Sequence, residues 1–216
     1  MLIYLYLGFE VIAFLTALFQ FSKIRLSYYK YFVPYLFFIV LYEIGSYFNW
    51  FSINHTNLWA ANITMGLSFI FYGLLLVRLL KRSVLKKWIT RVIFLSIFLS
   101  LINNLFIQGF WNLNTITILV QYGLLILMTC FYFYELMNYK EKLIVIRLPG
   151  FWLNTGLLFF CLIQFLFFSA FAYMAYKNNY QYNSLFYVIS NIANAILYSC
   201  LSISFLCFNK TGNYLH

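Results

Sequence analysis

The chain has 216 residues, of which 65% are hydrophobic and only 8% are charged. Soluble domains carry about a quarter charged residues, so this composition excludes a soluble globular fold and indicates a protein whose solvent is lipid. A net charge of +10 would suit nucleic acid, but the cationic residues stand in short blocks between apolar runs. That placement is typical of membrane topology, so we predict a lipid bilayer as partner and no nucleic acid.

Residue types that carry chemistry are scarce. The chain contains no Asp, its two histidines are His55 and His216, and its four cysteines lie inside apolar runs without Cys-x-x-Cys spacing. These absences argue against Ser-His-Asp hydrolysis, intramembrane aspartyl proteolysis, haem held by paired histidines, and zinc sites. We therefore predict that the protein is not an enzyme and has no catalytic residues, no metal site and no cofactor.

Seven apolar runs are long enough to cross a bilayer core of about 30 Å, which requires roughly 20 apolar residues per helix. They lie at about 2–21, 32–50, 58–80, 92–110, 114–137, 151–175 and 185–208. Pro34 and Pro149 fall at the starts of the second and sixth runs, where a missing N–H costs least. We predict one all-α domain, residues 1–216, folded as a bundle of seven transmembrane helices. The first run is expected to be a retained span rather than a cleaved signal peptide.

The basic residues predict the orientation of this bundle. Of the 14 Lys and Arg residues, 12 fall after the first, third or fifth apolar run. Cationic loops beside membrane spans stay in the cytoplasm, so we expect the N-terminus outside and the C-terminus inside. The stretch 78–91 is the richest, and we interpret it as a cytoplasmic basic loop. Its cations are Arg78, Lys81, Arg82, Lys86, Lys87 and Arg91.

Two carboxyl groups interrupt the apolar runs. Glu10 lies near the middle of the first run and Glu43 slightly outside the middle of the second, with no Lys or Arg at matching depth. A charged group at the centre of a membrane helix costs about 3 kcal/mol, so such residues are candidates for function. They form either a proton-titrating or cation-contacting pair, or two protonated groups that only join helices by hydrogen bonds. The other acids, Glu135 and Glu141, lie beside Lys140 and Lys142, and local charge balance explains them.

Amides and tyrosines supply the remaining polar groups of the apolar runs. One face of the seventh run repeats them at helical spacing, at Tyr187, Asn191, Asn194 and Tyr198. Each amide alone is well explained as a hydrogen bond between helices. Because many of them fall at one depth, we predict an outward-facing polar pocket for a ligand or proton, formed with Glu10 and Glu43. Its other predicted members are Asn62, Asn103, Asn104, Gln121 and Gln164.

Three short segments carry a family resemblance. They are Leu148-Pro-Gly-Phe-Trp-Leu-Asn-Thr-Gly-Leu157, Tyr132-Phe-Tyr-Glu135 and the Asn-bearing seventh run. In these segments and in its organisation the chain resembles a group of small seven-helix membrane proteins of Bacteroidota. The resemblance implies a multi-pass protein of the bacterial inner membrane with a suggestion of signalling, and it assigns no site residues.

Three functions follow as hypotheses. The first is a heptahelical sensor or signalling component that receives a small ligand at the polar pocket. Because no output domain is evident, it would act on a membrane or cytoplasmic protein partner through the basic loop. The alternative is a small-solute or proton-coupled transporter that uses Glu10 and Glu43. The third is a structural or assembly subunit of a membrane complex, in which the polar residues only join helices.

Overall fold

The computed structural model describes residues 3–25, 27–53, 56–138, 144–175 and 182–208. Within these residues the chain forms eight α-helices and, in place of any strand, an isolated bridge between Ile53 and Thr56. The helices are α1 (Ile3–Phe19), α2 (Phe21–Ile24), α3 (Phe32–Tyr47), α4 (Leu58–Leu79), α5 (Ser83–Ile102), α6 (Thr115–Met137), α7 (Pro149–Ala175) and α8 (Tyr182–Cys207). Short helical segments add η1 (Tyr28–Tyr31), the π-helical η2 (Asn103–Ile107) and η3 (Val145–Arg147).

Five of these helices are long and apolar enough to cross a membrane. The candidate spans are Leu58–Leu79, Ser83–Ile107, Thr115–Met137, Pro149–Ala170 and Val188–Cys207. Helices α1 and α3 have 17 and 16 residues, so they rise only about 24–26 Å. The predicted all-α fold is therefore confirmed, and its five candidate spans are compatible with a membrane protein. The count of seven spans and the sidedness of the termini stay predictions.

The stretch 78–91 differs from its predicted form, because most of it is helix rather than loop. Arg78 lies in the last turn of α4, only Leu80, Lys81 and Arg82 separate the helices, and α5 already begins at Ser83. The start of the fourth run was therefore placed nine residues too late. Hydropathy misses this part because Lys and Arg lower the local hydropathy. They are nevertheless good helix formers, and their long apolar stems let the charged groups reach water. Of the predicted loop cations, Lys86, Lys87 and Arg91 belong to α5.

Contacts between distant segments show that successive long helices alternate in direction. The guanidinium of Arg78 lies 5.0 Å from the ring centroid of Tyr28, which precedes α3. The centroid of the Tyr29 ring lies 4.7 Å from that of the Phe208 ring, which places the end of α8 at the same end. There the Ser204 hydroxyl of α8 donates to the carbonyl of Pro149 at the start of α7, at 2.7 Å. We call this end of the bundle the basic end. The connections α3–α4 and α5–α6 meet at the other end, which we call the opposite end, through bonds from Asn62 to the 110–114 segment.

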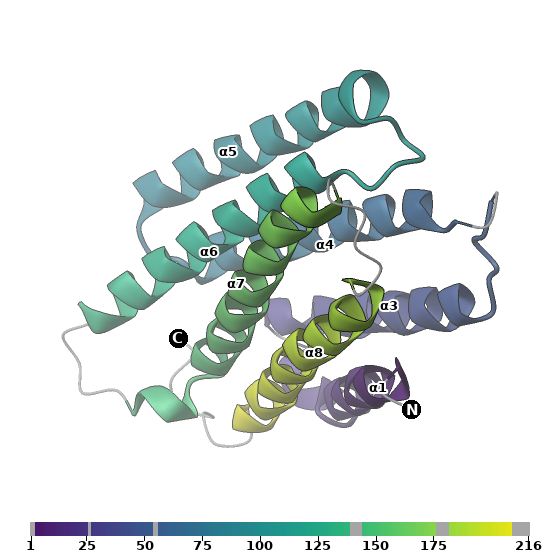
Figure 1. The fold of residues 1–216 in the computed structure, drawn as a ribbon. Helices are drawn as coiled ribbons and strands as arrows, with labels where there is room; N and C mark the ends of the chain where they lie inside the picture. The colour runs from purple at the N-terminus through teal and green to yellow at the C-terminus, as the bar shows by residue number, and fades with distance from the viewer. Residues whose placement is uncertain (1–2, 26, 54–55, 139–143, 176–181, 209–216) are drawn as a thin grey trace.

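Figure 1 shows α5 at one edge of the bundle and α1 at the other, with α7 and α8 side by side. The main core runs through the bundle, with buried members on all seven long helices, and Phe32, Leu76 and Phe205 are fully buried in it. By contrast, α5 carries large apolar side chains on its outside, including Phe94 and Phe98 at 64% and 60% exposure. An outward apolar surface of this kind suits contact with lipid rather than water.

The α7–α8 pair packs most closely, and a glycine permits it. A Cβ placed on Gly156 would lie 2.6 Å from Cβ of Cys200 and 3.3 Å from the carbonyl oxygen of Leu197. Such distances leave no room for a side chain, so the backbone of α7 rests directly on α8. Small residues at the contact are the usual way in which membrane helices approach each other, and the composition predicts such contacts only locally.

Candidate functional site

The two carboxyl groups predicted from the sequence lie together between α1, α3 and α8. Glu10 on α1 is 2% exposed, whereas Glu43 on α3 is half-buried and only four residues from the end of its helix. The two groups are close enough to interact electrostatically, and the phenol of Tyr198 on α8 hydrogen-bonds with the Glu10 carboxyl. The Tyr6 hydroxyl donates to Oε2 of Glu43 at 2.6 Å. We call Tyr6, Glu10, Glu43 and Tyr198 the carboxyl cluster.

The carboxyl cluster contains two acidic side chains and no basic side chain. Within the described part of the chain, neither carboxyl is paired with a Lys or Arg. Oε2 of Glu10 is buried and has no hydrogen-bonding partner among the described residues. A buried carboxylate that lacks a cation is costly, and phenol donors offset only part of that cost. The arrangement therefore suits a group that exchanges a proton better than it suits a permanent anion.

Further hydroxyl groups surround Glu10. Tyr35 and Tyr72 both lie within electrostatic range of its carboxyl. The Tyr35 hydroxyl donates to Oγ of Ser68 at 3.0 Å, which ties α3 to α4. The Tyr35 ring stacks on Phe71 with centroids 3.9 Å apart, so the position of the phenol is fixed by packing. Nothing in the sequence marks Tyr6, Tyr35 or Tyr72 as members of the site, because tyrosines are common throughout this chain.

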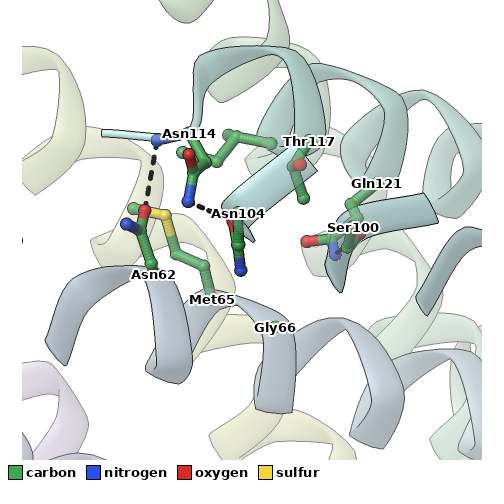
Figure 2. Close-up of a pocket in the computed structure, with 9 residues that line it drawn as sticks. Asn62, Met65, Gly66, Ser100, Asn104, Asn114, Thr117 and Gln121 are labelled. Carbon is green, nitrogen blue, oxygen red and sulfur yellow. Dashed lines mark hydrogen bonds between the residues drawn. The ribbon is translucent and has the colours of Figure 1, made fainter. Parts of the chain in front are cut away.

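A second polar group lies between α4, α5 and α6 near the opposite end. It encloses a cavity of about 40 Å³, shown in Figure 2, which we call the amide cavity. In Figure 2 the side chains of Asn104 and Asn114 point toward one another across it, while Ser100 and Thr117 approach from the other side. The lining consists of Asn62, Met65, Gly66, Ser100, Asn104, Asn114, Thr117, Ile118 and Gln121.

The π-helical segment η2 shapes this cavity. Its first residue, Asn103, accepts a hydrogen bond from the backbone N–H of Gln108 at 3.0 Å, five residues later. The Asn103 amide also donates to Oε1 of Gln108 and to Oγ1 of Thr117, both at 2.8 Å, so the end of α5 is joined to the start of α6. Single π-turns are often found at functional sites. The wider turn contributes Asn104, the next residue, to the cavity.

Asn62 on α4 fixes the connection that closes the cavity. Its amide nitrogen donates to the carbonyl oxygens of Phe110 and Asn112 at 3.2 and 2.7 Å. Its oxygen accepts from the backbone N–H of Asn114 at 3.2 Å. All three bonds reach a segment about 50 residues away in the chain, so this predicted pocket residue holds the α5–α6 connection in place. The Asn114 side chain in turn donates to Oδ1 of Asn104.

The predicted site residues therefore form two groups rather than one. Glu10, Glu43 and Tyr198 meet in the carboxyl cluster, and Asn62, Asn104 and Gln121 line the amide cavity with Asn103 beside them. Gln164 and Asn191 are buried on α7 and α8, Asn194 is half-buried on α8, and none of these three lines the cavity. The side chain of Tyr187 lies outside the described residues. Sequence depth alone could not separate the groups, because it does not say which helices are neighbours.

Glu135 has structural partners on the backbone before α5. Its two carboxylate oxygens accept hydrogen bonds from the backbone N–H groups of Lys81 and Arg82, at 2.7 and 3.1 Å. These groups precede α5 and have no partner within that helix, so the carboxylate serves as a cap supplied by α6. The guanidinium of Arg82 also lies 5.7 Å from the Tyr134 ring centroid. Glu141, Lys140, Lys142, Lys177 and Lys210 lie outside the described residues.

The comparisons with known proteins add no assignment to this geometry. No protein-family model matches the chain, and neither a curated protein nor a solved structure matches it.

Proposed function

We propose that the protein is a multi-pass membrane protein of the bacterial inner membrane that moves protons, alone or coupled to a small solute, through Glu10 and Glu43. The observation that carries the proposal is the carboxyl pair itself. Two acids on different helices meet in the bundle without a cation from the described residues, and one buried oxygen remains unpaired. Intramembrane carboxyl groups of this kind are typical of proton relays and proton-coupled carriers.

The difference in burial between Glu43 and Glu10 suggests the order in which a proton reaches the two carboxyl groups. Glu43 is half-buried and lies about 6 Å from the end of α3, whereas Glu10 is almost fully buried. In the proposed mechanism, a proton from the opposite end binds the Glu43 carboxylate beside the Tyr6 hydroxyl and passes to the Glu10 carboxylate. Tyr198 on α8 orients Glu10. With the predicted orientation, the opposite end faces outward and the basic end faces the cytoplasm.

Flux measurements in liposomes test this proposal. Purified protein is reconstituted in vesicles that contain a pH-sensitive dye, and proton uptake is recorded after a pH jump. We expect Glu10→Gln and Glu43→Gln to lower the rate at least roughly tenfold, which corresponds to about 1.4 kcal/mol in the barrier. Glutamine keeps the shape of the side chain but cannot take up the proton.

Glu135→Gln is the matched control, because it makes the same chemical change at an acid outside the cluster. It should leave the flux per folded molecule unchanged. Equal flux from wild type, Glu10→Gln and Glu43→Gln would contradict a proton-carrying role. No flux from any version would favour the sensor or the assembly subunit instead.

The sensor is the second candidate, and the ordered cations of the basic end favour it. Arg78 lies over the rings of Tyr28 and Tyr31, and Arg91 lies 5.6 Å from the Trp88 ring centroid. Glu135 also fixes the turn between α4 and α5. The cations therefore form a positively charged surface with fixed positions, which would suit an acidic protein partner. In this reading, protonation of the carboxyl cluster would be the signal and the basic end would transmit it.

A further inference from the structure

The amide cavity has features that the proton path does not use. We propose that it is a binding site for a very small uncharged molecule of the amide class, a primary carboxamide or urea. The inference stands apart from the carboxyl cluster, since none of that cluster's residues lines the cavity. It concerns what the space between α4, α5 and α6 can recognise.

The lining of the amide cavity is uncharged. The cavity is lined by six side chains with amide or hydroxyl groups and by Met65, Gly66 and Ile118, with no acid and no base among them. An ion would have to give up its water here without gaining a counter-ion, which is strongly unfavourable. A neutral molecule with strong hydrogen-bonding groups meets no such cost. The lining therefore selects against ions and in favour of neutral polar molecules.

Some hydrogen-bonding groups of the lining remain unused by the protein. Among the hydrogen bonds of the described residues, Gln121 uses its Nε2, which donates to Ser100 at 3.2 Å, and none uses its Oε1. Asn104 accepts from Asn114 through Oδ1, and in Figure 2 its Nδ2 points toward Gly66. Asn114 adds no further group, because its Oδ1 is buried and has almost no accessible surface. One donor, Nδ2 of Asn104, and one acceptor, Oε1 of Gln121, are thus left over, and an amide supplies both complements in one small planar group.

The volume of the cavity limits the size of its occupant. One water molecule needs about 10–15 Å³ of space of this kind, so a cavity of about 40 Å³ holds roughly three waters or one very small solute. A Cβ built on Gly66 would meet nothing within 4 Å, so the floor of the cavity is open backbone. Met65 provides a flexible wall that can adjust to an occupant. Only the smallest members of the amide class fit.

Formamide is the probe that tests the proposal, with formate as its charged counterpart of nearly equal size. Saturation-transfer NMR on the full-length protein in micelles measures weak binding of both. The limit on affinity per atom places the dissociation constant for formamide on the order of 1 mM at best. We expect a saturable formamide signal and none from formate.

Two matched glycine variants locate the binding. Gly66→Leu places an aliphatic side chain in the cavity and should weaken formamide binding at least roughly tenfold. Gly8→Leu makes the same change at an exposed position of α1 where a Cβ also meets nothing within 4 Å, and it should leave binding unchanged. Loss in both variants would place the effect outside the cavity and overturn the proposal.

The remaining outcomes are also decisive. No saturable formamide signal from the wild type means that the cavity holds water only, and equal binding of formate contradicts the charge argument. Either result overturns the proposal. Glu10→Gln should bind formamide as the wild type does, so loss of proton flux in that variant and loss of amide binding in Gly66→Leu are separate results.

Discussion

The carboxyl cluster and the amide cavity both place polar groups inside an apolar helical bundle, but they do so with different chemical groups. The cavity distributes neutral dipoles over α4, α5 and α6, and hydrogen bonds such as those of Asn62 tie distant segments together. The carboxyl cluster concentrates two acids between α1, α3 and α8 and leaves one buried oxygen unpaired. Neutral amides contribute to stability through hydrogen bonds and do not change their charge. A pair of carboxyl groups, in contrast, suits a function in which protons are taken up and released.

The largest effect on stability is expected at the amide cavity, from Asn62→Ala. The change leaves the carbonyls of Phe110 and Asn112 and the N–H of Asn114 without their partner. Each of the three hydrogen bonds contributes about 0.5–1.5 kcal/mol net, so a total loss of about 2–4 kcal/mol is expected. Denaturant unfolding in micelles measures it. Asn57→Ala is the control, because that side chain makes no capping bond, and an equal loss there would contradict the assignment.

Glu135→Gln should have the next largest effect, although this acid belongs to neither group. The amide retains one acceptor oxygen for the N–H groups of Lys81 and Arg82 but removes the negative charge. Hydrogen bonds to charged groups contribute more than neutral ones, so we expect a loss of about 1–2 kcal/mol in unfolding free energy. Glu10→Gln, measured in the same way, should lose less. A greater loss in Glu10→Gln would make that carboxyl structural.

Tyr6→Phe should have a smaller effect on both stability and flux. It removes only the hydroxyl that donates to Glu43 at 2.6 Å, so about 0.5–1.5 kcal/mol of unfolding free energy is at stake. Proton flux should fall by less than in Glu43→Gln, because the carboxyl itself remains. The liposome assay and thermal unfolding together check this. If Tyr6→Phe abolished flux while Glu43→Gln did not, the phenol rather than the carboxyl would be the essential group.

The smallest effect concerns the two glycines with open surroundings. Alanine is favoured over glycine inside a helix by about 0.5–1 kcal/mol, so Gly8→Ala should stabilise the protein by that amount. Gly66→Ala should stabilise it by less, because its methyl group would displace water or solute from the amide cavity. Thermal unfolding of both variants under one condition gives the difference. Equal stabilisation would show that nothing polar occupies the space beside Gly66.

The sequence predicted the helical fold well but the spatial grouping poorly, for physical reasons. Apolar runs marked the middle of each long helix, because lipid requires apolar side chains along a span. The apolar runs did not predict the start of α5 at Ser83, because cationic residues follow it, and they did not predict the π-turn at Asn103. Glu10 and Glu43 were identifiable as acids in apolar runs. Their meeting with Tyr198 depends on helix neighbours, which one sequence does not reveal.

Residues missed by the sequence analysis share a property: their role comes from a partner far away in the chain. Tyr6 acts on Glu43, 37 positions later, and Glu135 acts on the backbone of Lys81, 54 positions earlier. Gln108 is a nearer case, since its amide oxygen accepts from the N–H of Ile116 at the start of α6. Hydropathy and spacing describe one helix at a time, so contacts between helices lie beyond them.

Infrared difference spectroscopy tests the central claim, that the carboxyl pair takes up and releases a proton, most directly. The C=O stretching band of a protonated carboxyl is recorded from the reconstituted protein as the pH is stepped through the physiological range. We expect a band that changes with pH in the wild type and is altered or lost in both Glu10→Gln and Glu43→Gln, while Glu135→Gln retains it. A band that does not change with pH, or one that survives in both variants, would contradict the account.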